Sequence, residues 1–131
     1  MNEYKVNGDG LQAGHAGDPH SSDWQLRASR LAKIVSYSCD TTTKIAHRSA
    51  NSMEIMGLPS VGPTEEWTDC ITPEDLPFFE NAVKSISLEK PHFEVEYRVR
   101  HAKTGARFWV LDRGGGEFDE EGHLRHICGA I

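Results

Sequence analysis

The sequence predicts a single α+β domain in which helices cover one face of an antiparallel sheet. A chain of 131 residues is long enough for one hydrophobic core but not for two. Strand-like and helix-like segments follow one another as two strands, three helices and three strands, an order that favours antiparallel pairing. Apolar and charged residues alternate strictly from Phe93 to Arg100, which predicts a strand with one buried and one solvated face.

Composition and charge are typical of a soluble globular domain. Hydrophobic residues make up 37% of the chain, and no apolar run approaches the roughly 20 residues that a membrane span needs. The first residues lack a secretory signal, so we expect a cytoplasmic location. A net charge of -6 with scattered basic residues argues against nucleic acid as a partner. Cys39, Cys70 and Cys128 are odd in number and far apart, so we expect reduced thiols.

The first third of the sequence divides by composition near residue 21. Residues 1–21 are rich in glycine and almost free of apolar residues, which predicts a flexible leader. A flanking helix is expected over residues 22–33, because Ser22 can cap it and Asp23 opposes the positive end of its dipole. One stripe of this helix is apolar and consists of Trp24, Ala28 and Leu31. The stripe packs either on the chain's own sheet or on a second copy, and the sequence leaves both open.

The domain proper is expected over residues 34–131, and it begins with a hairpin. Residues 34–40 and 44–47 are rich in β-branched and aromatic side chains, and a run of three threonines joins them. We therefore expect two antiparallel strands at this point.

Two short helices are expected next. The first covers residues 49–56 and ends at Gly57, whose freedom at positive φ suits a helix C-terminus. Residues 61–63, with Gly followed by Pro, are interpreted as a break in regular structure. Residues 64–67 have the cap-then-acid order of a second short helix.

The longest helix of the domain is expected to begin after Asp75. Proline is tolerated only in the first helical turn, so Pro77 fixes the start and makes Asp75 the cap. One face of this helix is apolar and is expected to cover a sheet; it comprises Leu76, Phe79, Val83 and Ile86.

The sheet is completed by strands in the last forty or so residues. The alternating strand that begins at Phe93 is followed by a turn at 103–106 and a second strand at 108–111. The glycines at 114–116 are interpreted as a flexible break or bulge. A turn at 119–122 then leads into a third strand that ends at Ile131.

The layout and five short segments together resemble the PAS fold, over about residues 34–131. They are similar to the PAS subgroup whose pattern reads ellGl, HPdD, eyRv and dGxxrWv. The segments are residues 53–58 (MEIMGL), 72–75 (TPED), 96–99 (EYRV), 104–110 (TGARFWV) and 122–129 (GHLRHICG). The resemblance implies a PAS-like five-stranded antiparallel sheet, whose concave face and central helices enclose a pocket for sensing or for partner contacts.

The sequence departs from this pattern in two places. Thr72 stands where the family has histidine before the proline, and Cys39 stands where an aromatic residue usually precedes the aspartate of the first strand. Many relatives continue beyond the equivalent of Ile131 into a linker. The resemblance therefore implies an effector domain outside this chain, as in the regulatory domains of bacterial two-component histidine kinases or diguanylate cyclases.

The cofactor motifs of light-sensing and oxygen-sensing relatives are missing. The resemblance would place a flavin-attacking cysteine in an Asn-Cys-Arg-Phe-Leu-Gln helix, but Cys70 lies in Thr-Asp-Cys-Ile-Thr. The long helix contains no histidine for haem, although haem through His47, His92 or His101 stays open. We therefore expect neither chromophore.

Other reactive residues fit structural roles. His123 and His126 lie three apart on a strand and point to opposite faces, so we expect no metal site there. No convergent acid–base pair is visible, so no catalytic residue is predicted. Arg98 alternates away from the buried face and is expected to form a surface ion pair.

The pocket is expected to be apolar, with a few polar groups from aromatic side chains. Burial in an ordinary core is the alternative for each candidate. The candidates are Tyr37, Ile55, Met56, Trp67, Phe79, Val83, Val95, Tyr97 and Val110.

These observations together predict a sensory domain and not an enzyme. We expect it to bind a small ligand or a partner, to form a homodimer through the helix with Trp24, Ala28 and Leu31, and to signal to an effector domain. Two alternatives remain: a small α+β cone enzyme with a base in its cavity, or a purely structural dimerisation module with a filled core.

Overall fold

The computed structural model of the chain describes residues 19–131, so residues 1–18 of the leader predicted over 1–21 lie outside the described residues. The chain divides into two compact units, with the boundary between Ala32 and Lys33. Helix α1, Pro19–Ala32, belongs to the first unit. It begins three residues before the predicted Ser22, within the segment assigned to the leader. Proline suits the first turn of a helix, where its missing N–H has no partner.

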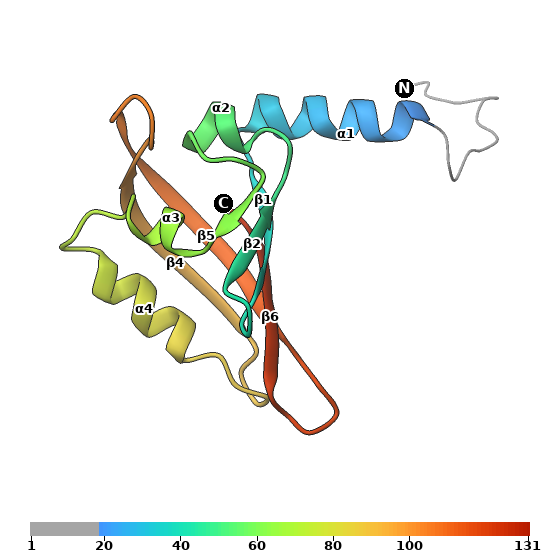
Figure 1. The fold of residues 1–131 in the computed structure, drawn as a ribbon, viewed down its shortest axis with the longest axis vertical. Coiled ribbons are helices and arrows are strands. Elements are labelled where there is room, and N and C mark those ends of the chain that lie inside the picture. Colours follow the sequence, from blue (N-terminus) through green and yellow to red (C-terminus); the bar gives the residue numbers. More distant parts are fainter. Residues whose placement is uncertain (1–18) are drawn as a thin grey trace, which may run out of the picture. The chain divides into compact units, whose positions relative to one another are not determined.

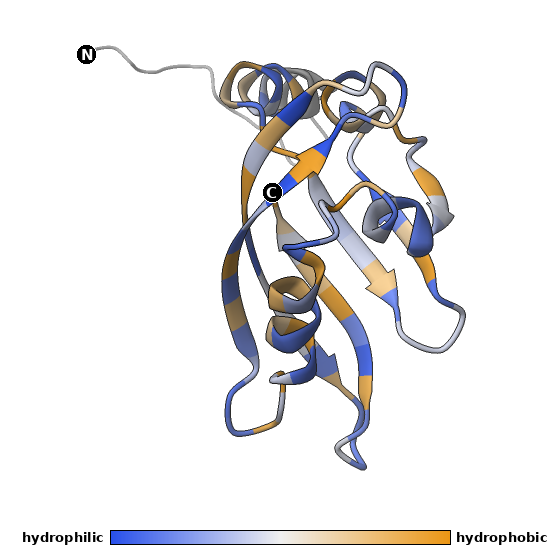
Figure 2. Cartoon of the chain, turned by 90° about the vertical axis from the view of Figure 1, so that its left-hand side faces the viewer, coloured by the Kyte–Doolittle hydropathy of each residue, from blue (hydrophilic) through white to orange (hydrophobic). Residues whose placement is uncertain are grey.

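The second unit is built on a sheet of six antiparallel strands in the order β3-β2-β1-β6-β5-β4 (Figure 1). The sequence predicted five strands, and the additional one is β3. Hydrophilic and hydrophobic residues alternate along the longer strands, as the predicted period of two requires (Figure 2). The strands are β1, Ser36–Asp40; β2, Ile45–Arg48; β3, Val61–Pro63; β4, His92–Arg100; β5, Arg107–Phe118; and β6, Leu124–Ala130.

Strand β3 corrects the interpretation of residues 61–63 as a break. Val61, Gly62 and Pro63 pair with His47, Ala46 and Ile45 of β2. Proline cannot donate a hydrogen bond within a ladder, but β3 is at the edge of the sheet, where no further strand needs that donor.

Strand β5 corrects a second interpretation, because the glycines at 114–116 lie inside it. Gly114 pairs with Phe93 on one side and with Gly129 on the other. A Cβ at Gly114 would lie 2.9 Å from the Phe93 ring, and one at Gly129 would lie 2.6 Å from the Tyr37 hydroxyl. Glycine therefore allows two aromatic rings to lie directly on the strand backbones.

Three helices lie between β2 and β4: α2, Ser52–Met56; α3, Glu65–Thr68; and α4, Leu76–Lys84. Helix α2 begins three residues after the predicted Ser49 and ends at Gly57, which has the predicted positive φ, 77°. Helix α4 ends at Lys84, so Ile86 follows the helix instead of extending its apolar face.

Asp75 occupies the predicted cap position of α4, but its side chain makes no capping hydrogen bond. Both carboxylate oxygens accept hydrogen bonds from the Arg98 guanidinium at 2.8 Å, and one also accepts from the Arg98 backbone N–H. The guanidinium in turn lies 5.3 Å from the centre of the Trp109 ring. Arg98 therefore forms the expected ion pair with its own side chain 47% exposed, but the partner Asp75 is buried, and the pair ties the start of α4 to β4.

The core lies where α3 and α4 meet the inner face of β4 (Figure 1). Tyr97 is fully buried there, with the rings of Trp67 and Phe79 at edge-on angles to it, their centres 6.2 and 5.3 Å away. Phe79, on the apolar face of α4 that was expected to cover a sheet, therefore contacts the inner face of β4 at Tyr97. Within residues 19–131, no helix combines the length and apolarity that crossing a membrane would require.

Candidate functional site

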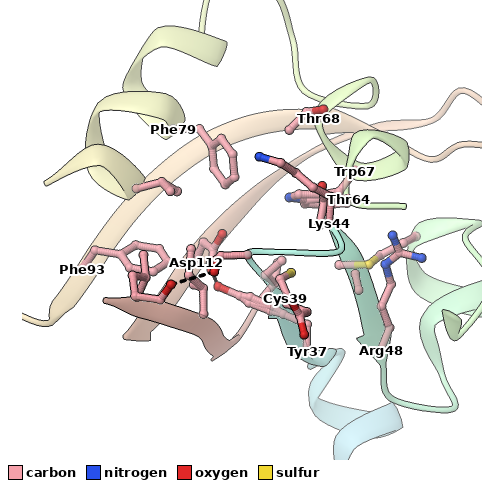
Figure 3. Close-up of a pocket in the computed structure, with 18 residues that line it drawn as sticks. Tyr37, Cys39, Lys44, Arg48, Thr64, Trp67, Thr68, Phe79, Phe93 and Asp112 are labelled. Carbon is pink, nitrogen blue, oxygen red and sulfur yellow. Dashed lines mark hydrogen bonds between the residues drawn. The ribbon is translucent and has the colours of Figure 1, made fainter. Parts of the chain in front are cut away.

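The inner face of the sheet and the helices above it enclose a cavity of about 320 Å³, all of it within the second unit (Figure 3). This volume is at the lower end of the range of small-molecule sites. Its walls come from β1, β2, all three helices of this unit and the last three strands. The lining residues are Tyr37, Cys39, Asp40, Thr41, Lys44, Ala46, Arg48, Met56, Thr64, Trp67, Thr68, Phe79, Val83, Phe93, Asp112, Leu124, Ile127 and Ile131.

The structure divides the predicted pocket residues into two groups. Tyr37, Met56, Trp67, Phe79 and Val83 line the cavity. The other four belong to the adjoining hydrophobic core instead of the cavity wall: Ile55, Val95, Tyr97 and Val110. Tyr97 is excluded because Trp67 and Phe79 cover its ring.

Sequence reasoning missed most of the polar wall. Asp112 was missed because the second strand was predicted to end at Leu111, the residue before it, whereas β5 continues to Phe118. The alternation that makes Phe108 and Val110 inward-facing continues to Asp112 and would have placed a carboxylate on the buried face. The turn residue Lys44 gave no such signal, because its approach to the cavity depends on the hairpin geometry.

Asp112 is the centre of a buried hydrogen-bond network at the cavity. Its two carboxylate oxygens accept hydrogen bonds from the hydroxyls of Tyr37, at 2.6 Å, and Tyr97, at 2.7 Å (Figure 3 shows the first). The indole N–H of Trp67 donates to the Tyr97 hydroxyl at 2.9 Å. Trp67 and Tyr37 belong to the cavity wall, so the network connects that wall to the core through the fully buried Tyr97.

Burial governs the protonation of this network. Desolvation raises the pKa of Asp112, and the hydrogen bonds from Tyr37 and Tyr97 only partly oppose that rise. The pKa of each tyrosine is raised well above its ordinary value, first by burial and then by the neighbouring Asp112 charge. Both phenols therefore stay protonated and act as donors.

Arg48 lies on the cavity wall but already has partners. Its guanidinium donates to the carbonyl oxygens of Pro59 at 2.8 Å and Pro63 at 3.2 Å, and to the Glu66 carboxylate at 3.2 Å. A Cβ at Gly62 would collide with that carboxylate, so glycine makes room for it. Arg48 therefore holds β2, β3 and α3 together.

The cysteines do not have the surroundings of an activated thiol. Burial raises the pKa of Cys39, on the cavity wall, to about 11, so it is a neutral thiol near pH 7. Cys70 is buried away from the cavity lining, where its thiol donates to the Glu66 carbonyl at 3.3 Å. All three cysteines are free.

The histidines considered for haem, His47, His92 and His101, lie outside the cavity lining. His101 uses its ring to bind backbone atoms, with Nε2 3.2 Å from the Glu54 carbonyl and Nδ1 accepting from Lys103.

His123 and His126 have different neighbours. His123 lies 3.6 Å from both Asp119 and Glu121 in the β5–β6 turn, whereas His126 lies 3.6 Å from Asp40. Ligand atoms of Asp119, Glu121 and His123 come within 4.8 Å of one another, close enough for a metal ion. The Asp119 carboxylate also accepts the backbone N–H groups of Glu121 and His123, so turn formation already accounts for this cluster.

Comparison with known proteins agrees with this architecture. The family model of the PAS fold matches residues 45–131. A comparison with curated protein sequences finds no match.

Solved structures give the same result. A sensory box histidine kinase/response regulator of Burkholderia thailandensis is 26% identical, with a TM-score of 0.67 over 82% of this chain and 81% of that one. The N-terminal domain of a diguanylate cyclase with a PAS/PAC sensor from Marinobacter aquaeolei is 20% identical. Its TM-score is 0.64, and the match covers 74% of this chain and 91% of that one. A domain of a putative light and redox sensing histidine kinase from Haloarcula marismortui is 17% identical. Its TM-score is 0.63, and the match covers 80% of this chain and 95% of that one. With two thirds of its length matched by the family model, this chain belongs to the PAS family.

Proposed function

We propose that this chain is a sensory module that binds a small molecule in its cavity and passes a conformational change to an effector domain outside the chain. The observation that carries the proposal is the cavity itself, an apolar space of about 320 Å³ enclosed by the sheet and the helices. Similar solved domains come from a histidine kinase and a diguanylate cyclase, and we propose an effector of such a kind in a bacterial, cytoplasmic signalling protein.

The ends of the domain offer a route for the signal. Ile131 lines the cavity, and its backbone exchanges two hydrogen bonds with Val35, at 2.8 and 2.9 Å. A ligand that displaces the Ile131 side chain therefore acts on both the first and the last strand segment of the domain. It shifts the signalling equilibrium only by its difference in affinity between the two arrangements.

A binding role fits the cavity better than catalysis does. Among the described lining residues, Asp112 and Arg48 are the buried charged groups, and both already hold protein partners. Membership of the PAS family argues against the alternative of a small α+β cone enzyme. The open space argues against the other alternative, a dimerisation module with a filled core.

The proposal can be tested by filling the cavity. Ile127 faces inward from the middle of β6, so Ile127→Phe adds bulk to the cavity in a strand that accommodates phenylalanine. Leu111→Phe is the matched control, because Leu111 is 39% exposed on the opposite face of the neighbouring strand. We expect a metabolite library, screened by thermal shift, to contain compounds that stabilise the wild type and Leu111→Phe but not Ile127→Phe.

The size of the expected shift follows from binding linkage. A ligand at one hundred times its Kd stabilises the folded state by roughly 2.7 kcal/mol, which corresponds to a rise in Tm of roughly 10 °C for a domain of this size. Compounds that stabilise Ile127→Phe as much as the wild type bind outside the cavity. A library with only such compounds would contradict the proposal.

A further inference from the structure

The cavity wall carries four charged side chains, and three of them have partners. Arg48 is bound to Glu66, Asp112 to two tyrosines, and the Asp40 carboxylate accepts the backbone N–H groups of Thr42 and Thr43. Lys44 is the fourth, and its side chain is exposed at the cavity. Its ammonium group forms no hydrogen bond or ion pair with any residue in the described part of the chain.

The backbone of Lys44 has a conformation that lysine rarely adopts. Its φ is 62°, in the left-handed region, at the end of the β1–β2 turn. Hairpin turns place glycine or asparagine at such positions, because a Cβ is unfavourable there. A role for the side chain explains why this turn carries lysine instead.

The turn holds Lys44 in a fixed place over the cavity. Its backbone N–H donates to the Asp40 carbonyl at 2.9 Å, and its carbonyl accepts from Thr64 at 3.0 Å. The Lys44 side chain extends over the cavity on the side of Thr64 and Thr68, two further residues of the lining (Figure 3). The Thr68 hydroxyl already donates to the Glu65 carbonyl at 3.1 Å, so the Lys44 ammonium is the group on this side of the cavity that can bind a carboxylate.

The rest of the cavity is suited to an uncharged hydrocarbon body. Its walls include Phe79, Val83, Phe93, Leu124 and Ile127, which offer apolar surface without hydrogen-bonding groups. A volume of about 320 Å³ corresponds to about ten groups of the size of a water molecule. The carboxylate of Asp112 also borders this space, but it is a hydrogen-bond acceptor, so an anionic ligand group would gain nothing from it.

We propose that the cavity selects small monocarboxylic acids of about ten non-hydrogen atoms with an apolar body, and that Lys44 binds their carboxylate. The inference rests on the proposed ligand-binding function and adds the chemical class of the ligand. Lys44 determines specificity: it attracts the acid and orients the apolar body toward Phe79 and Ile127.

The test uses the full chain and three unbranched probes of eight carbons each that differ in their polar end group: octanoate, octanol and octylamine. Calorimetric titration is expected to give the tightest binding for octanoate and the weakest for octylamine. Lys44→Gly removes the amine and also suits the left-handed backbone, so this variant should fold at least as well as the wild type. We expect it to weaken octanoate binding about tenfold and to leave octanol binding unchanged.

Three further variants make the result specific. Lys44→Arg keeps the charge and should retain most of the octanoate affinity. Lys103→Gly removes an exposed lysine from the β4–β5 turn, outside the cavity lining, and should have no effect. Ile127→Phe should abolish octanoate binding, and octanoate that still binds this variant is outside the cavity, which would overturn the inference.

The remaining outcomes separate this inference from the proposed function. Equal binding of octanol and octanoate, both insensitive to Lys44→Gly, would overturn the acid class while leaving a ligand-binding cavity intact. Stronger binding of octylamine, or no binding of octanoate to the wild type, would also overturn it. The library screen with Ile127→Phe then decides separately whether the cavity binds any small molecule.

Discussion

At the scale of single residues, two buried carboxylates have pKa values displaced in opposite directions. Hydrogen bonds from Arg98 lower the pKa of Asp75 to about 2. Burial raises the pKa of Asp112, because its two tyrosine donors compensate only part of the lost hydration. The two shifts have different causes: the charged Arg98 guanidinium stabilises the Asp75 carboxylate through hydrogen bonds, whereas Asp112 loses hydration on burial and has only neutral hydroxyl donors.

The two carboxylates should therefore contribute to stability with opposite dependence on pH. Asp75 is more acidic in the folded state, so its contribution is present above the unfolded pKa of about 3.9 and is lost as pH falls toward about 2. Asp112 is less acidic in the folded state, so its contribution is largest below about 3.9 and declines as pH rises through its folded pKa.

Urea unfolding of Asp75→Asn, Asp112→Asn and the wild type across this pH range measures both effects. The free-energy difference between wild type and Asp75→Asn should grow as pH rises to about 4 and then level off. The difference between wild type and Asp112→Asn should shrink over the same rise and beyond it. Parallel curves for the two variants would contradict the assigned directions.

At the scale of elements, periodicity predicted β4 and the apolar face of α4, because each has one face in the core and one in water. It failed at β3 and in the second half of β5. Gly62, Pro63 and the glycines 114–116 carry no apolar pattern, and they are in strands because tertiary contacts favour small or edge residues there. Local sequence propensity cannot reveal that Phe93 requires glycine at position 114 or that Tyr37 requires it at position 129, because these residues are far apart in the sequence.

Phe79→Ala tests the packing of α4 against β4. The full cost of deleting a buried phenylalanine is about 3–5 kcal/mol, but Phe79 is only half-buried and borders the cavity. We therefore expect a loss of about 2 kcal/mol, part of it from the edge-on contact with Tyr97. Phe78→Ala is the matched control: Phe78 is 61% exposed on the same helix, and its removal should change the free energy of unfolding by less than about 0.5 kcal/mol. Equal losses in the free energy of unfolding for the two variants, measured by urea unfolding, would contradict the packing of Phe79 between α4 and β4.

At the scale of the whole molecule, the sequence predicted the fold more completely than the cavity. Alternation identified inward-facing positions on β4 and in the first part of β5, but it cannot tell whether a helix or open space lies above them. Val95 and Tyr97 lie under side chains of the helices, whereas Tyr37 and Phe93 lie beside the cavity. That distinction depends on where α4 and the β1–β2 turn lie, which is set by contacts between residues far apart in the sequence.

Self-association is the remaining property of the whole molecule, and we expect it to depend on α1. Within this helix Trp24 is 55% exposed and Leu31 is 86% exposed, and together with Ala28 they form the stripe for which a second copy is a suitable partner. Removing residues 1–33 deletes the stripe at the boundary between the two compact units, so the remaining domain should still fold. Light scattering is expected to give a dimer for the full chain and a monomer for the shortened one.

Point variants separate the role of the stripe from that of the rest of the deleted segment. Trp24→Ala should weaken dimerisation at least about thirtyfold, because an aromatic side chain at the centre of an interface typically contributes 2 kcal/mol or more. Trp109→Ala removes an equally large side chain, 66% exposed on the sheet, and should leave the dimer unchanged if α1 is the interface. If the shortened chain dimerises with undiminished affinity and Trp109→Ala abolishes it, the interface is the sheet face instead. A ligand signal would then pass directly through the strands that border the cavity, with no need for the helix.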